Sequence, residues 1–219
     1  MIPVKPDPVR GRTYGGQSPA QRSAERRAAL LEAAFSLVAE HGWRELRIDA
    51  LCRSAGLNKR YFYESFSDLD ALVSALTDGL ARETIAAALA GIGPRTAPEA
   101  ATRRAVDALV GHLTDDPRRA RVLFGAVPAT EAAAGHRTEA IRRIVAAAAG
   151  TGQGLHHLRA GPELDIAAAM LVGGTSQTLL DWLDGRIPAS RPELVDSLVG
   201  LWQAVEARTV DQARRHDGI

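Results

Sequence analysis

The chain has 219 residues, of which 46% are hydrophobic and 24% charged, the balance of an ordinary globular protein. Its one cysteine, Cys52, excludes an internal disulfide and favours a reducing compartment. No apolar run approaches the ~20 residues of a membrane-spanning helix, and the N-terminus lacks the apolar core of a signal peptide. The composition therefore predicts a cytoplasmic protein that has no membrane partner.

Charge is distributed unevenly, although the net charge is only +1. Residues 1–67 hold 11 Lys and Arg against 7 Asp and Glu, whereas the remainder holds 16 against 19. A basic N-terminal third is typical of a segment that meets an anion such as DNA. Chance asymmetry is the alternative explanation.

Residues 1–17 are rich in proline and glycine and predict a flexible basic arm. Its cations are Lys5, Arg10 and Arg12. The arm is either a leader without function or a segment that reaches the minor groove of DNA.

From residue 18 onwards the pattern is helical. Ser18-Pro19-Ala20-Gln21 combines a cap, a proline at the first helical position and a capping-box glutamine, and the helix that follows should end at Gly42. Later helix starts are expected at Ser67, Thr96, Asp116, Gly161 and Ser190. An all-α fold of about nine helices without a sheet results, with breaks near 42, 55–57, 66, 91–95, 115, 126–129, 150–161 and 185–190.

Residues 47–65 have the pattern of a helix-turn-helix. The first short helix has an apolar face that includes Cys52, Gly56 supplies the tight turn, and Asn58 is placed to cap a second helix over 59–65. In the second helix Phe62 and Phe66 should face the core. The side chains left pointing outward are Lys59, Arg60, Tyr61, Tyr63 and Glu64.

Cations and phenols on such a helix bind phosphates and base edges in the major groove of DNA. The forked donors of Arg60 suit guanine in particular. The alternative is an ordinary solvated face on a small helical bundle.

Over roughly residues 25–75 the chain resembles the TetR family of one-component regulators. The matching positions are Gly42, Leu51, Ala55, Gly56, Leu57, Asn58, Phe62, Tyr63, Phe66 and Leu72. Three positions depart from the family pattern: Arg47 replaces a threonine, Cys52 an alanine, and Asp68 a lysine that often touches a phosphate. We therefore carry no phosphate contact over to Asp68.

The resemblance implies a DNA-binding regulator, by default a repressor, released from a palindromic operator by a small-molecule effector. It implies that Tyr61 and Tyr63 contact phosphates and that Lys59 and Arg60, with Asn58, face bases. The complete expected DNA-binding set is Arg47, Asn58, Lys59, Arg60, Tyr61 and Tyr63.

The resemblance also implies a division into a flexible arm (1–17), a DNA-binding domain (18–67), a connecting helix (68–94) and a ligand-binding and dimerisation domain (95–219). Two long helices near 163–184 and 191–213 resemble the helices that pair in TetR homodimers. Expected interface residues are Leu171, Gly174, Leu194, Leu198, Leu201 and Trp202. Candidate effector contacts, each also explicable as plain core, are His112, Phe124, Met170, Gln177 and Trp182.

The competing classes are a helical-bundle enzyme and an adaptor without DNA binding. The sequence has no nucleophile elbow, phosphate loop or dinucleotide fingerprint, and Cys52 should be buried and inert, so we predict no enzymatic activity and no cofactor. His136, His156 and His157 lack the spacing of metal ligands in what reads as a glycine-rich loop, so we predict no metal site.

Overall fold

A computed structural model describes residues 18–125 and 130–217. The predicted basic arm and the predicted break at 126–129 lie outside the described residues. Within those residues the chain forms nine α-helices, one short 3₁₀-helix and no strand, which confirms the all-α prediction. The helices are α1 (Pro19–His41), α2 (Ile48–Ser54), α3 (Lys59–Ser65), α4 (Leu69–Leu89), α5 (Pro98–Asp115), α6 (Arg118–Phe124), α7 (Glu131–His156), α8 (Pro162–Leu183) and α9 (Arg191–Asp217), with the 3₁₀-helix at Trp43–Glu45.

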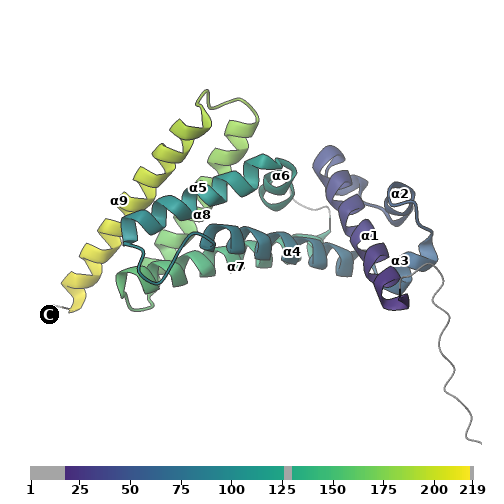
Figure 1. Cartoon of the computed structure of the whole chain (residues 1–219), viewed down its shortest axis with the longest axis horizontal. Coiled ribbons are helices and arrows are strands. Elements are labelled where there is room, and N and C mark those ends of the chain that lie inside the picture. The colour runs from purple at the N-terminus through teal and green to yellow at the C-terminus, as the bar shows by residue number, and fades with distance from the viewer. Residues whose placement is uncertain (1–17, 126–129, 218–219) are drawn as a thin grey trace, which may run out of the picture.

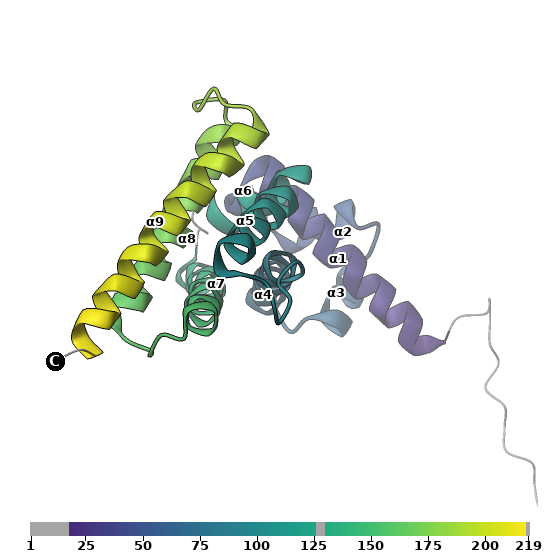
Figure 2. The ribbon, with the colours of Figure 1, turned by 60° about the vertical axis from the view of Figure 1, so that its left-hand side comes forward.

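The helices form an elongated molecule with distinct ends (Figure 1). Helices α1, α2 and α3 cluster at one end, and α8 and α9 lie side by side at the other, an arrangement that the rotated view repeats (Figure 2). Helix α4 extends away from the first cluster, next to α7 and α5. Among the described helices none combines the length and the apolar character that a bilayer crossing requires.

Helix α1 begins and ends as its sequence predicts. The Ser18 hydroxyl accepts a hydrogen bond from the Gln21 N–H at 3.1 Å, while the Gln21 side chain accepts one from the Ser18 N–H at 2.6 Å. Pro19 occupies the first helical position, where no N–H is needed. Gly42 terminates the helix with φ of 79°, a left-handed conformation that favours glycine.

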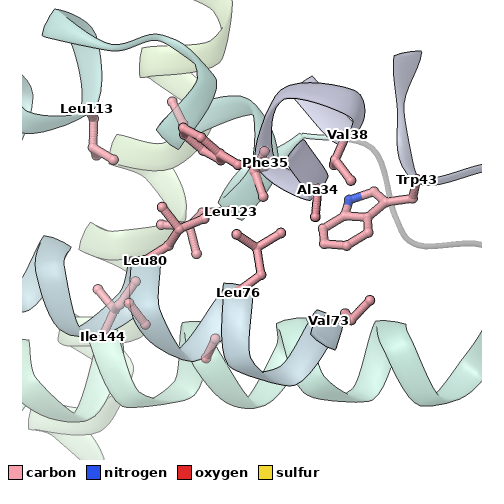
Figure 3. Close-up of a cluster of buried hydrophobic side chains, with 14 of the residues drawn as sticks. Ala34, Phe35, Val38, Trp43, Val73, Leu76, Leu80, Leu113, Leu123 and Ile144 are labelled. Carbon is pink, nitrogen blue, oxygen red and sulfur yellow. The ribbon is translucent and has the colours of Figure 1, made fainter. Parts of the chain in front are cut away.

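One hydrophobic core runs through both ends of the molecule (Figure 3). Phe35 and Val38 of α1 pack near Leu76 of α4, and the cluster continues through Leu123 of α6 to Ile144 of α7. These side chains are all at least nine-tenths buried. Because burial of each such side chain contributes about 1.5–3 kcal/mol, the core fixes the helical cluster α1–α3 to the remaining helices.

Three helix starts lie one residue later than predicted. Asp68, not Ser67, caps α4, because its carboxylate accepts the Ala71 N–H at 2.7 Å. The Thr96 hydroxyl accepts from the N–H of Gly93 within the preceding turn, so Ala97 takes the cap position of α5. At α6 the residue before the helix is Pro117, and the Asp116 carboxylate accepts the Arg118 N–H.

The predicted break at 150–161 is wrong in its first half. Helix α7 continues through Gly150, Gly152 and Gly154 and ends at His156, after which His157 adopts φ of 53°. Each glycine costs a helix about 1 kcal/mol relative to alanine. Packing of α7 against α4 and α8 outweighs that cost. His156 therefore lies on a helix and not in a glycine-rich loop.

Burial in α2 should make Cys52 chemically inert. The residue is 5% exposed, and burial is the main cause that raises the pKa of its thiol. We expect a thiol reagent such as DTNB to label the native protein far more slowly than the guanidine-unfolded protein at pH 8. Equal labelling rates in the two states would contradict this packing.

Candidate functional site

Helices α2 and α3 form the predicted helix-turn-helix. Gly56 lies between them with φ of 65°, a left-handed backbone conformation that glycine adopts without strain. The Asn58 side-chain oxygen accepts the Tyr61 N–H at 3.1 Å and caps α3. The two helices and their connection thus follow from local sequence alone.

Helix α3 has one buried and one exposed side. Phe62 is fully buried, and its ring lies 6.0 Å from that of Phe66, which is also buried. On the opposite side Lys59, Arg60 and Tyr63 are exposed, with 83% of the Arg60 side chain accessible. The exposed side therefore presents two cations and a phenol, as the sequence predicts.

Each cation on this surface is paired with a carboxylate of its own chain. Lys59 Nζ lies 2.7 Å from Asp49 Oδ1, and Arg60 Nε lies 3.0 Å from Glu64 Oε1. The hydrogen bond to Asp49 raises the pKa of Lys59, which stays a cation. Because exposed pairs contribute about 1 kcal/mol or less, a phosphate is able to replace either carboxylate at small cost.

Tyr61 differs from the expectation that it points outward. It is half-buried, with the Arg26 guanidinium 4.7 Å from its ring centroid. Next to it, Arg27 lies 4.1 Å from the Phe66 ring and donates to the Ser65 carbonyl at 2.8 Å. These two arginines of α1 hold α3 in place. The sequence did not reveal them, because charged residues on a long helix are usually exposed to solvent.

The remaining expected DNA contacts lie at helix starts. Arg47 is exposed and precedes α2 without making a side-chain cap. Since Asn58 uses its oxygen in the α3 cap, its amide N–H groups are what remain for a base. Asp68 accepts hydrogen bonds at the start of α4, chiefly from the Ala71 N–H, which lower the pKa of Asp68. It is thus held as an anion near this surface, consistent with assigning it no phosphate contact.

The C-terminal helices enclose an apolar cavity of about 90 Å³. Its wall draws on α4, α5, α6, α7, α8 and α9. Of the five candidate effector contacts only Phe124 lines it. Met170 and Gln177 are exposed on α8, and the Trp182 indole N–H donates to the Ala189 carbonyl at 2.7 Å.

His112 also lies outside the cavity wall. Its Nε2 atom is buried without a hydrogen-bond partner, and burial is the first cause that lowers the pKa of the imidazole. Its carbonyl accepts from Arg119 Nη1 at 2.8 Å. The neutral ring is therefore a packing element beside α4.

Sequence reasoning missed the polar residues of the cavity. Thr102 of α5 and Glu206 of α9 line it, together with Trp202, which was expected at a dimer interface. The position of Glu206 one helical turn after Trp202 is the signal that would have found it, because residues four apart share a helix face.

The expected interface residues divide between core and surface. Leu194 and Leu198 are buried within this one chain, whereas Leu201 is 61% exposed and Gly174 is also exposed. Leu171 is half-buried, and the indole N–H of Trp202 donates to Thr175 Oγ1 at 3.0 Å. The six residues therefore do not form one surface.

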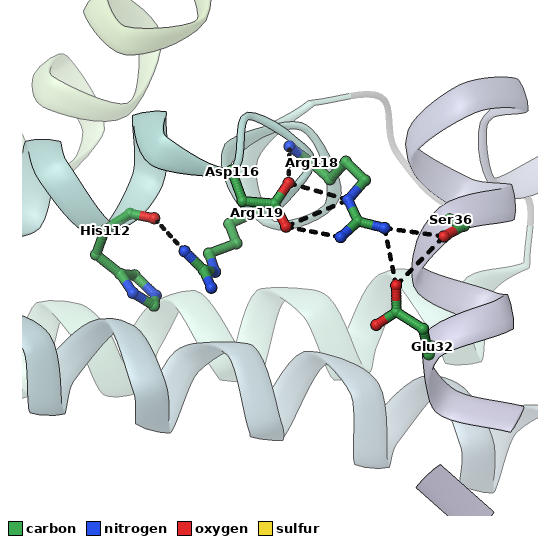
Figure 4. A network of polar contacts seen from close by, with 6 residues as sticks. All are labelled: Glu32, Ser36, His112, Asp116, Arg118 and Arg119. Carbon is green, nitrogen blue, oxygen red and sulfur yellow. Dashed lines mark hydrogen bonds and ion pairs between the residues drawn. The ribbon is translucent and has the colours of Figure 1, made fainter. Parts of the chain in front are cut away.

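A polar cluster around Arg118 joins α6 to α1 (Figure 4). The guanidinium lies 2.8 Å from Glu32 Oε1, 2.9 Å from Ser36 Oγ and 2.8 Å from Asp116 Oδ2. It also stacks 4.5 Å from the ring centroid of Phe35. The bond to Arg118 lowers the pKa of Asp116, and the two carboxylates raise that of Arg118.

Residues 30–76 match the family model described as "Bacterial regulatory proteins, tetR family". No curated protein sequence matches the chain. Among solved structures, 186 chains match. A TetR-like transcriptional regulator from Rhodococcus sp. RHA1 is 21% identical with a TM-score of 0.64, and the match covers 86% of this chain and 97% of that one.

Two further solved structures share the fold. A tetR-family transcriptional regulator from Streptomyces coelicolor is 21% identical with a TM-score of 0.68, over 89% of this chain and 86% of that one. A putative TetR-family transcriptional regulator from Syntrophomonas wolfei is 12% identical with a TM-score of 0.70, over 84% and 96%. The match over residues 30–76 and the shared fold make the chain similar to TetR-family transcriptional regulators.

The Arg118 cluster should contribute measurably to stability. In a double-mutant cycle of Arg118→Met and Glu32→Gln, we expect a coupling free energy of about 0.5–1 kcal/mol, small because Arg118 is partly exposed. The coupling should fall at high salt. Chemical denaturation of the four proteins measures it, and zero coupling at low salt would show that the contact does not hold α6 on α1.

Proposed function

We propose that this protein is a TetR-family transcriptional regulator. It binds a two-fold operator as a homodimer, represses transcription, and leaves the DNA when a small molecule enters the cavity of the C-terminal helices. The observation that carries the proposal is the exposed face of α3. Lys59, Arg60 and Tyr63 project from a helix that a buried phenylalanine and two α1 arginines hold in position.

In this proposal α3 lies in the major groove. Arg60 reads a guanine through two parallel hydrogen bonds, Lys59 and the Asn58 amide reach neighbouring bases, and Tyr63 donates to a phosphate. Arg47 contacts the backbone at the start of α2, whereas half-buried Tyr61 is left with its hydroxyl as its only contact to a phosphate. DNA phosphates displace Asp49 and Glu64 from the two cations.

Substitutions on α3 test this surface. With DNA from upstream of the regulator's own gene, Arg60→Ala should weaken binding about tenfold or more, since one bidentate base contact is worth about 1–3 kcal/mol. Tyr63→Phe should weaken it several-fold through loss of one hydrogen bond. Gel shifts over a range of salt concentrations measure both.

Arg142→Ala is the matched control, because Arg142 is an exposed arginine on α7. It should leave DNA affinity unchanged. Unchanged affinity and salt dependence in both α3 variants would reject this surface as the DNA contact. Absence of any specific shift by the unaltered protein, at low salt, would reject DNA binding itself and favour an adaptor or an enzyme.

For the dimer we propose pairing through the outward face of α8 and α9. Ile166, Met170 and Leu201 are large apolar side chains that this chain leaves more than half exposed. Exposed Gly174 and Gly200 on the same two helices allow close approach of a second copy. An apolar surface of this kind marks an interaction site, and two-fold pairing would set two α3 helices on half-sites about 34–36 Å apart.

Leu201→Glu tests the pairing. It should convert the dimer to a monomer at micromolar concentration in sedimentation velocity, because a carboxylate would be buried without a partner. Arg142→Glu introduces the same charge on α7 and should leave the dimer intact. A dimer that survives Leu201→Glu would contradict this interface, and a monomeric unaltered protein would contradict dimerisation altogether.

Release by a small molecule is supported by the position of α6. Phe124 of this helix lines the cavity, and Arg118 at its other end contacts Glu32 and Ser36 of α1. A ligand that displaces α6 therefore has a direct route to the helix that braces α3. Loss of promoter occlusion follows when the two α3 helices of a dimer no longer match their half-sites.

A further inference from the structure

The cavity wall is almost uniformly apolar. Its described lining consists mainly of Ala, Val, Leu and Ile side chains with Phe124 and Trp202, and Glu206 is its only ionisable residue. A volume of about 90 Å³ accommodates roughly six to nine water-sized groups. The wall thus suits a small molecule with an apolar body of about that many heavy atoms.

Most polar hydrogens on this wall are already used. The hydroxyls of Thr84, Thr151 and Ser176 donate to the carbonyls of Leu80, Ala147 and Val172, each in the residue's own helix, at 2.7–2.8 Å. The Trp202 indole N–H donates to Thr175 Oγ1. These groups have no donor to spare for an incoming anion.

Glu206, in contrast, has acceptor capacity that its own chain leaves unused. Its two carboxylate oxygens lie 3.0 and 2.8 Å from the Thr102 hydroxyl, which also lies 3.1 Å from the Pro98 carbonyl. Its Oε2 atom lies 3.6 Å from Nε2 of His156, within ion-pair distance but beyond a hydrogen bond. An ionised carboxylate has about four acceptor sites, so one hydroxyl leaves most of them open. Burial raises the pKa of Glu206, which reflects the cost of holding this charge away from water.

We propose that the cavity binds a small lipophilic primary amine, with its ammonium group on the Glu206 carboxylate and its hydrocarbon part among the apolar side chains. The inference rests on the proposed function for the role of the cavity and deepens it by naming the ligand class. Trp202, one turn before Glu206 on α9, adds an aromatic face for the cation.

The negative charge of Glu206 should make the cavity bind an amine more tightly than the neutral or anionic analogue of equal length. An ammonium group supplies three donors and offsets the buried negative charge. An alcohol of equal length supplies one donor and no charge. A carboxylate of equal length would meet Glu206 with like charge, on a wall where most hydroxyl and indole donors are already used.

The test is a matched series of hexylamine, hexan-1-ol and hexanoate, titrated calorimetrically into the full-length protein at pH 7.5 without DNA. We expect hexylamine to bind at least tenfold more tightly than hexan-1-ol, as for a hydrogen bond to a charged group, and hexanoate to bind more weakly than either. Glu206→Gln should remove the preference for the amine and leave the affinity for the alcohol within about threefold.

Glu139→Gln, an exposed glutamate on α7, is the control for attraction of the amine to surface charge and should change nothing. Thermal unfolding establishes that Glu206→Gln is folded. If it is not, the series on the unaltered protein still decides, because hexanoate binding as tightly as hexylamine overturns the proposal. Equal amine affinity in Glu206→Gln, or no binding by any member of the series, overturns it as well.

These outcomes are independent of the proposed regulation. If hexylamine binds through Glu206 but leaves the operator shift intact, the ligand class stands and release by ligand fails. If the operator shift is absent while the amine binds, DNA recognition fails alone.

Discussion

The buried face of α4 is the constraint on which the rest of the molecule depends. At its N-terminal end Val73 and Leu76 pack toward α1 and Trp43, and farther along Leu80 meets Leu123 and Ile144 (Figure 3). Thr84, one turn later, already lines the cavity. The same apolar side of α4 therefore supports the helix-turn-helix and forms part of the wall of the proposed effector site. Neither region can shift without repacking this helix.

Helix α6 is a second connection of a different kind. Ala120, Val122 and Leu123 are buried among the surrounding helices, while Arg118 holds α1 through charged and polar contacts at the edge of the core. Close-packed apolar side chains transmit strain with little deformation, whereas a partly exposed ion pair exchanges partners cheaply. Helix α6 is held both by apolar packing and by this ion pair. A change in cavity volume that moves α6 would therefore also move α1, in line with the proposed release.

The charges on the two proposed functional surfaces are arranged in opposite ways. On α3 the cations rest on exposed carboxylates and stay available to phosphate, since the intramolecular pairs are weak. In the cavity the one carboxylate is largely but not fully buried and accepts from the Thr102 hydroxyl, and a matching cation gains more there than in water. DNA affinity at the proposed α3 surface should thus depend strongly on salt concentration, and affinity in the cavity on the charge of the ligand.

Local signals determined much of this protein from sequence alone. Several features depend only on contacts between residues close in the sequence: the cap of α1, the turn at Gly56, the Asn58 cap and the inward-facing Phe62. Helices α2 and α3, with their exposed cations, were therefore predictable. Contacts between distant segments were not: the Arg26 stack on Tyr61, the Arg118 cluster and the meeting of Glu206 with Thr102 join residues whose spacing carries no period. Tertiary packing also keeps α7 helical across three glycines, because burial outweighs the intrinsic preference of single residues. The same packing buries Leu194 and Leu198 within the monomer, where the sequence predicted a dimer interface.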